Sequence, residues 1–224
     1  MTSIVFLVSG NGGTLKFVNE MIKRNHVQGL RIQHVISDRS CGALEYAKHE
    51  SIPNTLIKYD RKNTENMLAL LEDISPDIII TTFHKILDNQ IVSKFRGKLI
   101  NLHYSLLPSF KGLIGMQTVE EAIKLRSRFI GGTCHYVDEQ VDNGAIIAQF
   151  VFPLHYPPNI PKLQNIEFRA SCLLLLNSLL AIDKPLARTI GVNSLNFLTE
   201  TIFFEPAIIV DTESLNEEFW SNLS

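Results

Sequence analysis

The first two thirds of the chain alternate short apolar runs with helix-like segments, and this alternation limits the fold more than any other feature. Ile4–Val8 is an apolar run rich in β-branched residues, and a helical pattern over residues 15–24 follows it. The same order recurs in Ile32–Ile36 followed by residues 42–50. Strands that alternate with helices are typical of crossover units, which join parallel strands. We therefore expect an α/β fold with a doubly wound, mostly parallel sheet.

The parallel order is expected to break after residue 125. Up to that point the patterns predict further elements, which are helices at 64–72, 90–95 and 117–125 and strands at 78–82 and 99–103. Residues 132–137 and 145–152 are also strand-like, and only the polar turn 138–144 separates them. Strands joined by so short a turn pair antiparallel. The sequence thus predicts an antiparallel hairpin at the edge of the sheet.

A long apolar helix at residues 166–182 is expected to end the main part of the fold, because Asp183-Lys184-Pro185 cannot continue it. The tail beyond it has a strand-like run at 207–210 and an acidic helix at 214–223 with two aromatic residues. Those aromatic side chains indicate that the tail docks on the core. We expect a main domain at 1–182 and a small C-terminal extension at 183–224 packed on it.

Composition identifies a globular chain and excludes several classes of protein. Hydrophobic residues make up 45% and charged residues 20% of the 224 residues, which excludes disorder and fibrous repeats. A net charge of −2 argues against a nucleic acid partner. The start lacks the basic segment and cleavage site of a signal peptide, and no apolar run reaches the roughly 18 residues of a membrane span. Three separated cysteines without C-x-x-C spacing fit a reducing cytoplasm, so we expect a soluble, cytoplasmic protein without a membrane partner.

A glycine-rich turn lies between the first strand and the first helix. It is made of Ser9, Gly10, Asn11, Gly12, Gly13 and Thr14. Backbone N–H groups at such a turn, with a helix dipole behind them, form a site for a phosphate. Leu15 occupies the third glycine position of the dinucleotide fingerprint, which argues against a nicotinamide-dependent oxidoreductase. We expect these six residues to bind the phosphate of a substrate, with a tight strand-to-helix turn as the alternative.

Three polar residues are the candidates for catalysis. Asn101 and His103 are two residues apart on one expected strand, so their side chains lie on the same face at its carboxyl end. An amide beside an imidazole can hydrogen-bond a developing oxyanion, and the imidazole can move protons near neutral pH. Asp142, in the polar turn, could orient the imidazole or accept a proton. A buried histidine and a turn-capping aspartate remain the alternatives, and no histidine spacing predicts a metal.

These residues resemble those of a known enzyme family. Asn101-Leu-His103-Tyr-Ser-Leu-Leu-Pro108, followed by His135 and Val141-Asp142-Asn-Gly144, is similar to the 10-formyltetrahydrofolate-dependent formyltransferases, and the likeness runs from Ile4 to about Ile147. The resemblance implies a Rossmann-like catalytic domain that uses 10-formyltetrahydrofolate as co-substrate and no metal. It implies that Asn101 and His103 stabilise the tetrahedral intermediate and that Asp142 assists proton movement. It also implies two segments that hold the pterin, namely Phe83, His84, Lys85 and Leu87, and Val137, Asp138, Glu139 and Val141.

The resemblance leaves the acceptor of the formyl group open between two small molecules. The chain looks like sugar N-formyltransferases in its tail, and like glycinamide ribonucleotide transformylase in its glycine-rich turn and length. It departs from the latter at Gly112–Met116, where a polar His-containing stretch is expected, and at Ser171-Cys172, where a Glu-His pair contacts substrate. We therefore expect a dTDP-linked 4-amino-dideoxysugar as acceptor, for O-antigen or other surface polysaccharide synthesis. Glycinamide ribonucleotide, in purine biosynthesis, is the alternative.

Two further expectations concern turnover and assembly. A folate- or nucleotide-binding module without turnover is a third alternative, but the complete trio of Asn101, His103 and Asp142 argues against it. A tail rich in Ile and Phe favours a homodimer.

Overall fold

Two compact units make up the chain, as far as the computed structural model describes it, which is residues 1–61, 64–183, 192–212 and 214–223. The first unit contains residues 1–101 and 136–141, together with Leu223. The second contains residues 102–135 and 142–222. The chain passes from the first unit to the second inside one strand, between Asn101 and Leu102.

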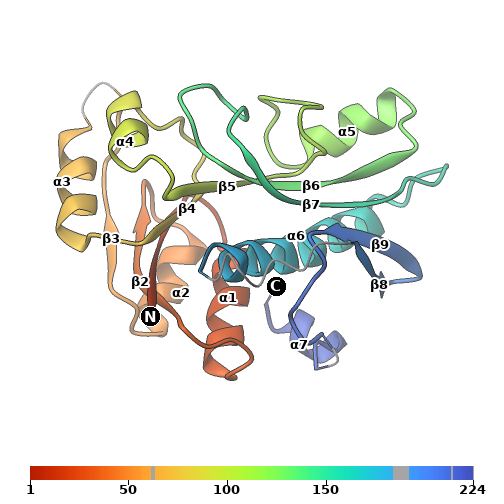
Figure 1. Cartoon of the computed structure of the whole chain (residues 1–224), viewed down its shortest axis with the longest axis horizontal. Coiled ribbons are helices and arrows are strands. Elements are labelled where there is room, and N and C mark those ends of the chain that lie inside the picture. The colour runs from red at the N-terminus through yellow and green to blue at the C-terminus, as the bar shows by residue number, and fades with distance from the viewer. Residues whose placement is uncertain (62–63, 184–191, 213, 224) are drawn as a thin grey trace. The chain divides into compact units, whose positions relative to one another are not determined.

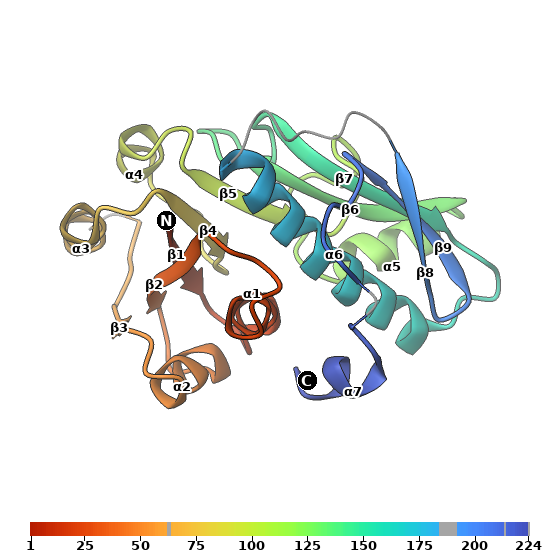
Figure 2. The same ribbon diagram turned by 60° about the horizontal axis from the view of Figure 1, so that its bottom comes forward.

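The first unit is a parallel sheet with helices on both faces (Figures 1 and 2). Its elements are β1 (Thr2–Val8), α1 (Gly13–Lys23), β2 (Leu30–Ser37), α2 (Gly42–His49), β3 (Asn54–Leu56), α3 (Glu65–Ile74), β4 (Ile78–Thr82), α4 (Asn89–Lys94) and the start of β5 (Leu99–His103). The strand order is β3-β2-β1-β4-β5, and every neighbouring pair is parallel. Helices α1 and α2 cover one face, and α3 and α4 cover the other (Figure 2). The expected doubly wound α/β fold is confirmed, and only the short β3 lacked a sequence signal.

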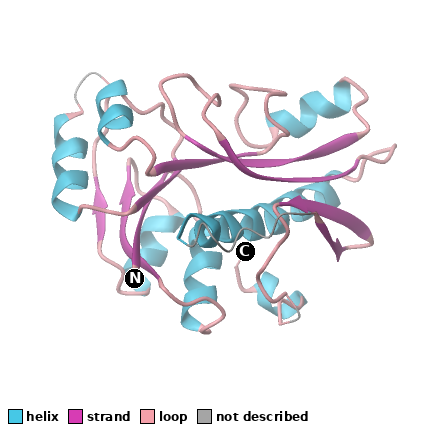
Figure 3. Cartoon of the chain, viewed as in Figure 1, coloured by secondary structure: helices cyan, strands magenta, loops and turns pink. Residues whose placement is uncertain are grey.

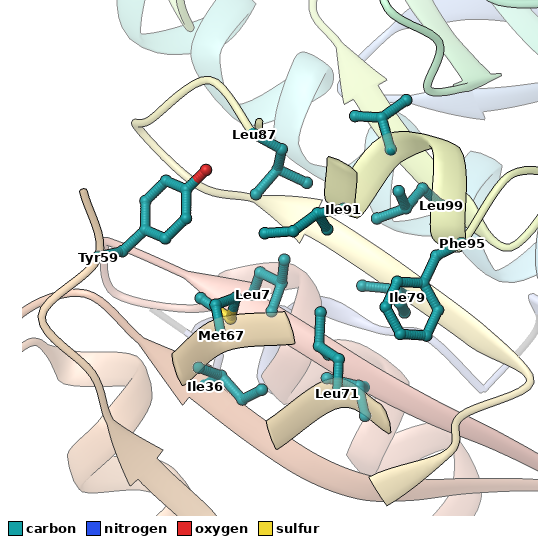
Figure 4. Packing of buried hydrophobic residues seen from close by; sticks show 12 residues of the cluster. Leu7, Ile36, Tyr59, Met67, Leu71, Ile79, Leu87, Ile91, Phe95 and Leu99 are labelled. Carbon is teal, nitrogen blue, oxygen red and sulfur yellow. The ribbon is translucent and has the colours of Figure 1, made fainter. Parts of the chain in front are cut away.

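The hydrophobic core of the first unit explains why its strands are uninterrupted apolar runs. β1 is buried from Ser3 to Val8, because helices cover both of its faces. On the side of α3 and α4, one cluster joins side chains from β1, β2, β4 and β5 to both helices (Figure 4). Its members are Val5, Leu7, Ile36, Tyr59, Met67, Leu71, Ile79, Leu87, Ile91, Val92, Phe95 and Leu99. This cluster fixes the carboxyl ends of β1 and β4, where the candidate ligand-binding segments begin.

The second unit is built on antiparallel strands (Figure 3). Its elements after β5 are α5 (Gln117–Lys124), β6 (Phe129–Tyr136), β7 (Ile146–Pro153), α6 (Ile160–Asp183), β8 (Asn193–Phe197), β9 (Glu200–Glu205) and α7 (Glu217–Ser221). The strand order is β6-β7-β9-β8, with antiparallel neighbours throughout. Helix α6 lies against β7 (Figure 1). The expected hairpin of 132–137 with 145–152 is confirmed as β6 and β7.

Helix α6 begins six residues earlier than expected, at Ile160, with Pro161 in its first turn, where a proline is tolerated. The Asn159 side chain accepts a hydrogen bond from the Lys162 backbone N–H (3.1 Å), which caps this start. By length and composition, Ile160–Ile182 could cross a membrane, with a mean hydropathy of 1.3 over its most apolar window. The helix is not an uninterrupted apolar run, because polar residues such as Asn177 and Ser178 lie within it. The protein itself buries 78% of that window, as in the core helix of a globular domain.

The tail differs from the prediction in its strands. Residues 207–210 form no strand, since the backbone N–H groups of Ile208 and Ile209 donate to the side chains of Asn193 and Asn177 instead of to a neighbouring strand. The strands of the tail are β8 and β9, which had no clear signal. The expected terminal helix is the shorter α7, capped by the side chain of Asn216. Residues 184–185, where the main domain was expected to end, lie outside the described residues, so a boundary at residue 182 stays a prediction.

The docking of the tail on the second unit uses aromatic and charged contacts. Phe219 and Trp220 of α7 are 2% and 4% exposed. Arg169 of α6 donates through both terminal nitrogens to the Glu217 carboxylate (2.6 and 2.5 Å) and lies over the Trp220 ring. Both aromatic side chains of α7 are therefore buried within the second unit, and the packing of residues 183–224 on the main domain stays a prediction.

Replacing Gly12 tests the glycine-rich turn of the first unit. Gly12 has φ +72°, and a Cβ atom there would lie 2.6 Å from the Cβ of Ala43. We expect Gly12→Ala to lower the free energy of unfolding by about 1–3 kcal/mol, through strain and this clash, in urea denaturation. The control is Gly10→Ala, because a Cβ at Gly10 meets nothing within 4 Å. Equal stability losses in the two variants would contradict this account.

Candidate active site

His103 and Asp142 form a buried pair in the second unit. The Nδ1 atom of His103, at the end of β5, lies 3.3 Å from Oδ2 of Asp142, and their side chains are 5% and 9% exposed. Asp142 has φ +52°, in the left-handed region that aspartate tolerates better than most residues. This backbone conformation belongs to the turn between β6 and β7. The structure thus brings together two of the three predicted catalytic residues, although they are far apart in the sequence.

The other nitrogen of His103 also faces an acceptor. Its Nε2 atom lies 3.2 Å from the carbonyl oxygen of Phe110. Both ring nitrogens therefore face oxygen atoms that can accept a hydrogen bond from a ring N–H group.

The segment after β5 is hydrogen-bonded to the turn that carries Asp142. The backbone N–H of Gly112 donates to Oδ2 of Asp142 (2.8 Å). Lys111 donates through Nζ to the side-chain oxygen of Asn143 (2.7 Å). The stretch Gly112–Met116, which was noted for its lack of polar side chains, thus contributes a backbone donor to the site. Ile114 in this stretch is 61% exposed.

Asn101, the third predicted catalytic residue, belongs to the first unit. It lies on β5 opposite Thr81 of β4 and is half-buried. Because side chains alternate along a strand, Asn101 and His103 project from the same face of β5.

The glycine-rich turn of the first unit has the features of an anion site. Gly12 precedes α1 in the left-handed conformation, and no side chain caps the helix. The first turn of α1 holds no acidic residue, so nothing there repels an anion. The Ser9 hydroxyl donates to Oδ1 of Asp38 (2.8 Å) and accepts from the backbone N–H of His84 (3.0 Å). These bonds tie the turn to the ends of β2 and β4.

Asp38 is held ionised at the end of β2. Its burial opposes ionisation, but hydrogen bonds from Arg39 and Ser9 outweigh this effect, so its pKa lies below the usual value. Arg39 donates through Nε (3.0 Å) and through a terminal nitrogen (2.7 Å). The carboxylate is therefore occupied by protein donors.

The two segments expected to hold the pterin meet on the same core cluster. Phe83 and Val137 pack against the cluster of the first unit, and Phe83 also contacts the ring of Tyr59 (5.5 Å between centroids). Leu87 is 6% exposed and belongs to the cluster itself, so its side chain has a structural role. His84 and Lys85 are exposed.

Residues 137–141 are held by hydrogen bonds and an ion pair within the first unit. The Val137 N–H donates to the Leu99 carbonyl (2.9 Å), and Asp138 accepts from the Gln140 N–H (2.9 Å). Glu139 pairs with Arg96, and Val141 is 49% exposed.

The sequence analysis assigned no role to Glu167, which is buried in α6. It is 1% exposed, and both carboxyl oxygens lack a hydrogen-bond partner among the described residues. Burial raises the pKa of this carboxyl to about 8. Glu167 also lies near Tyr104, the residue after His103. Burial raises the pKa of the Tyr104 phenol, and the nearby Cys172 and Glu167 add to this rise. A lone acidic residue inside an apolar helix was the signal that could have revealed it.

Ser171 and Cys172 of α6 are buried. They are 1% and 0% exposed in the core of the second unit. The long helix does carry a glutamate four residues earlier, at Glu167, and an aromatic residue, Phe168, follows it. This weakens the sequence argument that the helix lacks an acidic residue for the acceptor.

Comparisons with known proteins agree with the site. A family model described as formyl transferase matches residues 2–160, which is more than half of the chain. The chain is 31% identical over 173 residues to phosphoribosylglycinamide formyltransferase of Haemophilus influenzae, covering 73% of this chain and 79% of that protein. It is 29% identical to the chloroplastic phosphoribosylglycinamide formyltransferase of Vigna unguiculata, covering 67% of this chain. It spans about half, 51%, of that plant protein.

A solved structure matches almost the whole fold. The crystal structure of phosphoribosylglycinamide formyltransferase from Anaplasma phagocytophilum superposes with a TM-score of 0.73 at 24% identity, covering 95% of this chain and 96% of that one. The fold of this chain, most of its tail included, therefore occurs outside the sugar N-formyltransferases that the tail resembles. The Rossmann-like fold expected from the resemblance is confirmed, and the chain belongs to the formyl transferase family.

Proposed function

We propose that the protein transfers the formyl group of 10-formyltetrahydrofolate to the amine of glycinamide ribonucleotide. The observation that carries this proposal is the buried pair of His103 and Asp142, with both ring nitrogens of His103 facing oxygen acceptors. A ring N–H group held in this way can donate a hydrogen bond to an oxygen that becomes negative.

In the proposed reaction, Asn101 and His103 stabilise the formyl oxygen as the neutral amine of the acceptor attacks the formyl carbon. A new C–N bond forms to the amine, and the bond between the formyl carbon and N10 of the folate breaks. The attacking amine loses one proton and N10 gains one, and Asp142 assists this transfer through His103. The formyl oxygen takes the place of the Phe110 carbonyl as the acceptor for Nε2.

The first unit supplies binding groups for both substrates. The glycine-rich turn, Ser9 to Thr14, binds the phosphate of the acceptor through backbone N–H groups. The pterin lies against the segment of Phe83, His84, Lys85 and Leu87 and the segment of Val137, Asp138, Glu139 and Val141. Most of these contacts are to backbone groups, because Leu87 and Val137 are engaged in the core.

Glycinamide ribonucleotide replaces the amino sugar as our preferred acceptor. The relatives described above are named as phosphoribosylglycinamide formyltransferases, and the tail no longer argues for a sugar. Glu167 supports the same choice, because a buried carboxyl group without a partner can accept a hydrogen bond from a polar group of the substrate that receives the formyl group. A dTDP-linked 4-amino-dideoxysugar is the other candidate, since Gly112–Met116 offers exposed apolar rather than polar side chains.

Cytoplasmic location and a homodimer are part of this proposal. Both follow from the sequence expectations, and sedimentation velocity would test the assembly. Exposed apolar residues on the second unit, such as Phe203 (44%), support self-association.

Formyl transfer by the purified protein tests the proposed function. We offer 10-formyltetrahydrofolate with glycinamide ribonucleotide and, separately, with a panel of dTDP-amino-dideoxysugars, and we follow the tetrahydrofolate formed. Turnover with glycinamide ribonucleotide is expected. Asp142→Asn and His103→Ala should lower kcat by about 100-fold or more, with the KM for the folate little changed, because they remove transition-state interactions.

The control for these variants is Asp73→Asn, an exposed position on α3. Turnover with a dTDP-sugar alone would reject the proposed acceptor but keep the formyl transfer. Wild-type turnover in Asp142→Asn would remove this residue from the mechanism.

The pH dependence of stability tests the protonation state of the Glu167 carboxyl group in the folded protein. Its pKa is about 8 in the folded protein against an ordinary 4.5, so the folded state keeps a proton that the unfolded state loses between these values. Stability therefore falls as the pH rises through that window. We expect Glu167→Gln to reduce the fall of Tm between about pH 5 and about pH 8. Glu120→Gln, at an exposed position of α5, is the control, and an unchanged slope in Glu167→Gln would contradict the assignment.

A further inference from the structure

The carboxylate of Asp142 faces two histidines in the second unit, and the proposed mechanism uses only one of them. Oδ2 lies 3.3 Å from Nδ1 of His103, whereas Oδ1 lies 3.7 Å from Nε2 of His135. His135 is 2% exposed. Each carboxylate oxygen therefore has its own imidazole, and the two rings come from different strands, β5 and β6.

A backbone irregularity occurs at His135. In the pairing of β6 with β7, Cys134 lies opposite Ala148 but His135 lies opposite Ile146, so the register shifts between these two residues. A bulge of this kind re-aims the side chain next to it and is common beside active sites. The extra residue, Ile147, belongs to β7, and the irregularity lies beside the residue of β6 that faces Asp142.

We propose that His135 is a positioning residue for the reaction, acting through Asp142. Its Nε2–H group holds Oδ1, so that Oδ2 stays directed at His103. The separation of 3.7 Å is longer than a hydrogen bond, and contacts of catalytic groups often shorten when substrate binds. This inference rests on the proposed formyl transfer, because Asp142 has a catalytic role only there.

Three groups face the Asp142 carboxylate, and they come from different elements. They are His103 from β5, the Gly112 N–H from the following segment and His135 from β6. Lys111 is directed to Asn143.

Two substitutions separate positioning from packing. His135→Leu fills the space without a donor, and His135→Gln places an amide N–H near the position of Nε2. We expect His135→Leu to lower kcat by about 100-fold with the KM for the folate unchanged, because misplacement of a catalytic group has effects of this size. His135→Gln should restore most of the loss. The acid limb of the kcat profile should move to higher pH in His135→Leu, since the carboxylate loses a donor that favours its charged form.

The matched control is His155→Leu. His155 also faces a carboxylate, with Nε2 3.2 Å from Glu200, but its side chain is 69% exposed. We expect wild-type kcat in this variant. Equal losses in His135→Leu and His135→Gln, with an unmoved pH profile, would show that His135 only packs and would overturn the proposal.

An NMR measurement tests the contact without turnover. The Nδ1 proton of His103, hydrogen-bonded to a carboxylate, gives a low-field signal that is absent from His103→Ala. We expect this signal to weaken or shift in His135→Leu and to persist in His135→Gln and His155→Leu. An unchanged signal in His135→Leu would overturn the proposal. A changed signal in a protein that transfers no formyl group would reject the proposed function but keep the contact.

Discussion

The candidate catalytic centre of the second unit depends on one buried contact, between His103 and Asp142. A carboxylate that is 9% exposed is destabilised unless donors replace the water it has lost. The Gly112 N–H donates to Oδ2 of Asp142 (2.8 Å), and nitrogen atoms of His103 and His135 lie 3.3 and 3.7 Å from the two carboxylate oxygens. The turn between β6 and β7 therefore supplies the carboxylate, whereas β5, the segment after it and β6 bring nitrogen atoms to it.

Elements whose local pattern agrees with their packing could be predicted from sequence. β5 has the predicted bounds, 99–103, and the hairpin of β6 and β7 followed from two apolar runs around a polar turn. The pair of His103 and Asp142 was also predicted, through the resemblance to a family. For the strands, the residues that identify each element lie within the element itself, so long-range contacts agree with a choice that the local sequence had already made.

The elements that sequence missed are those that distant contacts decide. Residues 207–210 have a strand-like pattern, yet Asn177 and Asn193 satisfy their backbone from α6 and β8, and no neighbouring strand is needed. Glu167 was given no role from the sequence, and its burial without a hydrogen-bond partner among the described residues distinguishes it. His135 was noticed for its position before Asp142, but no spacing rule predicts the register shift that accompanies it. Such information depends on residues that are far away in the chain, so local propensity cannot supply it.

The Phe110 carbonyl oxygen shows how the pair can act on a substrate. It lies 3.2 Å from Nε2 of His103, at the distance and in the direction that an acceptor oxygen requires. In the proposed reaction the formyl oxygen needs the same position, and it becomes more negative as the amine adds. A donor fixed by Asp142 does not have to reorient during that change, so its hydrogen bond strengthens as charge develops. In the proposed reaction, the contact between His103 and Asp142 therefore serves to keep the imidazole in place before the substrate arrives.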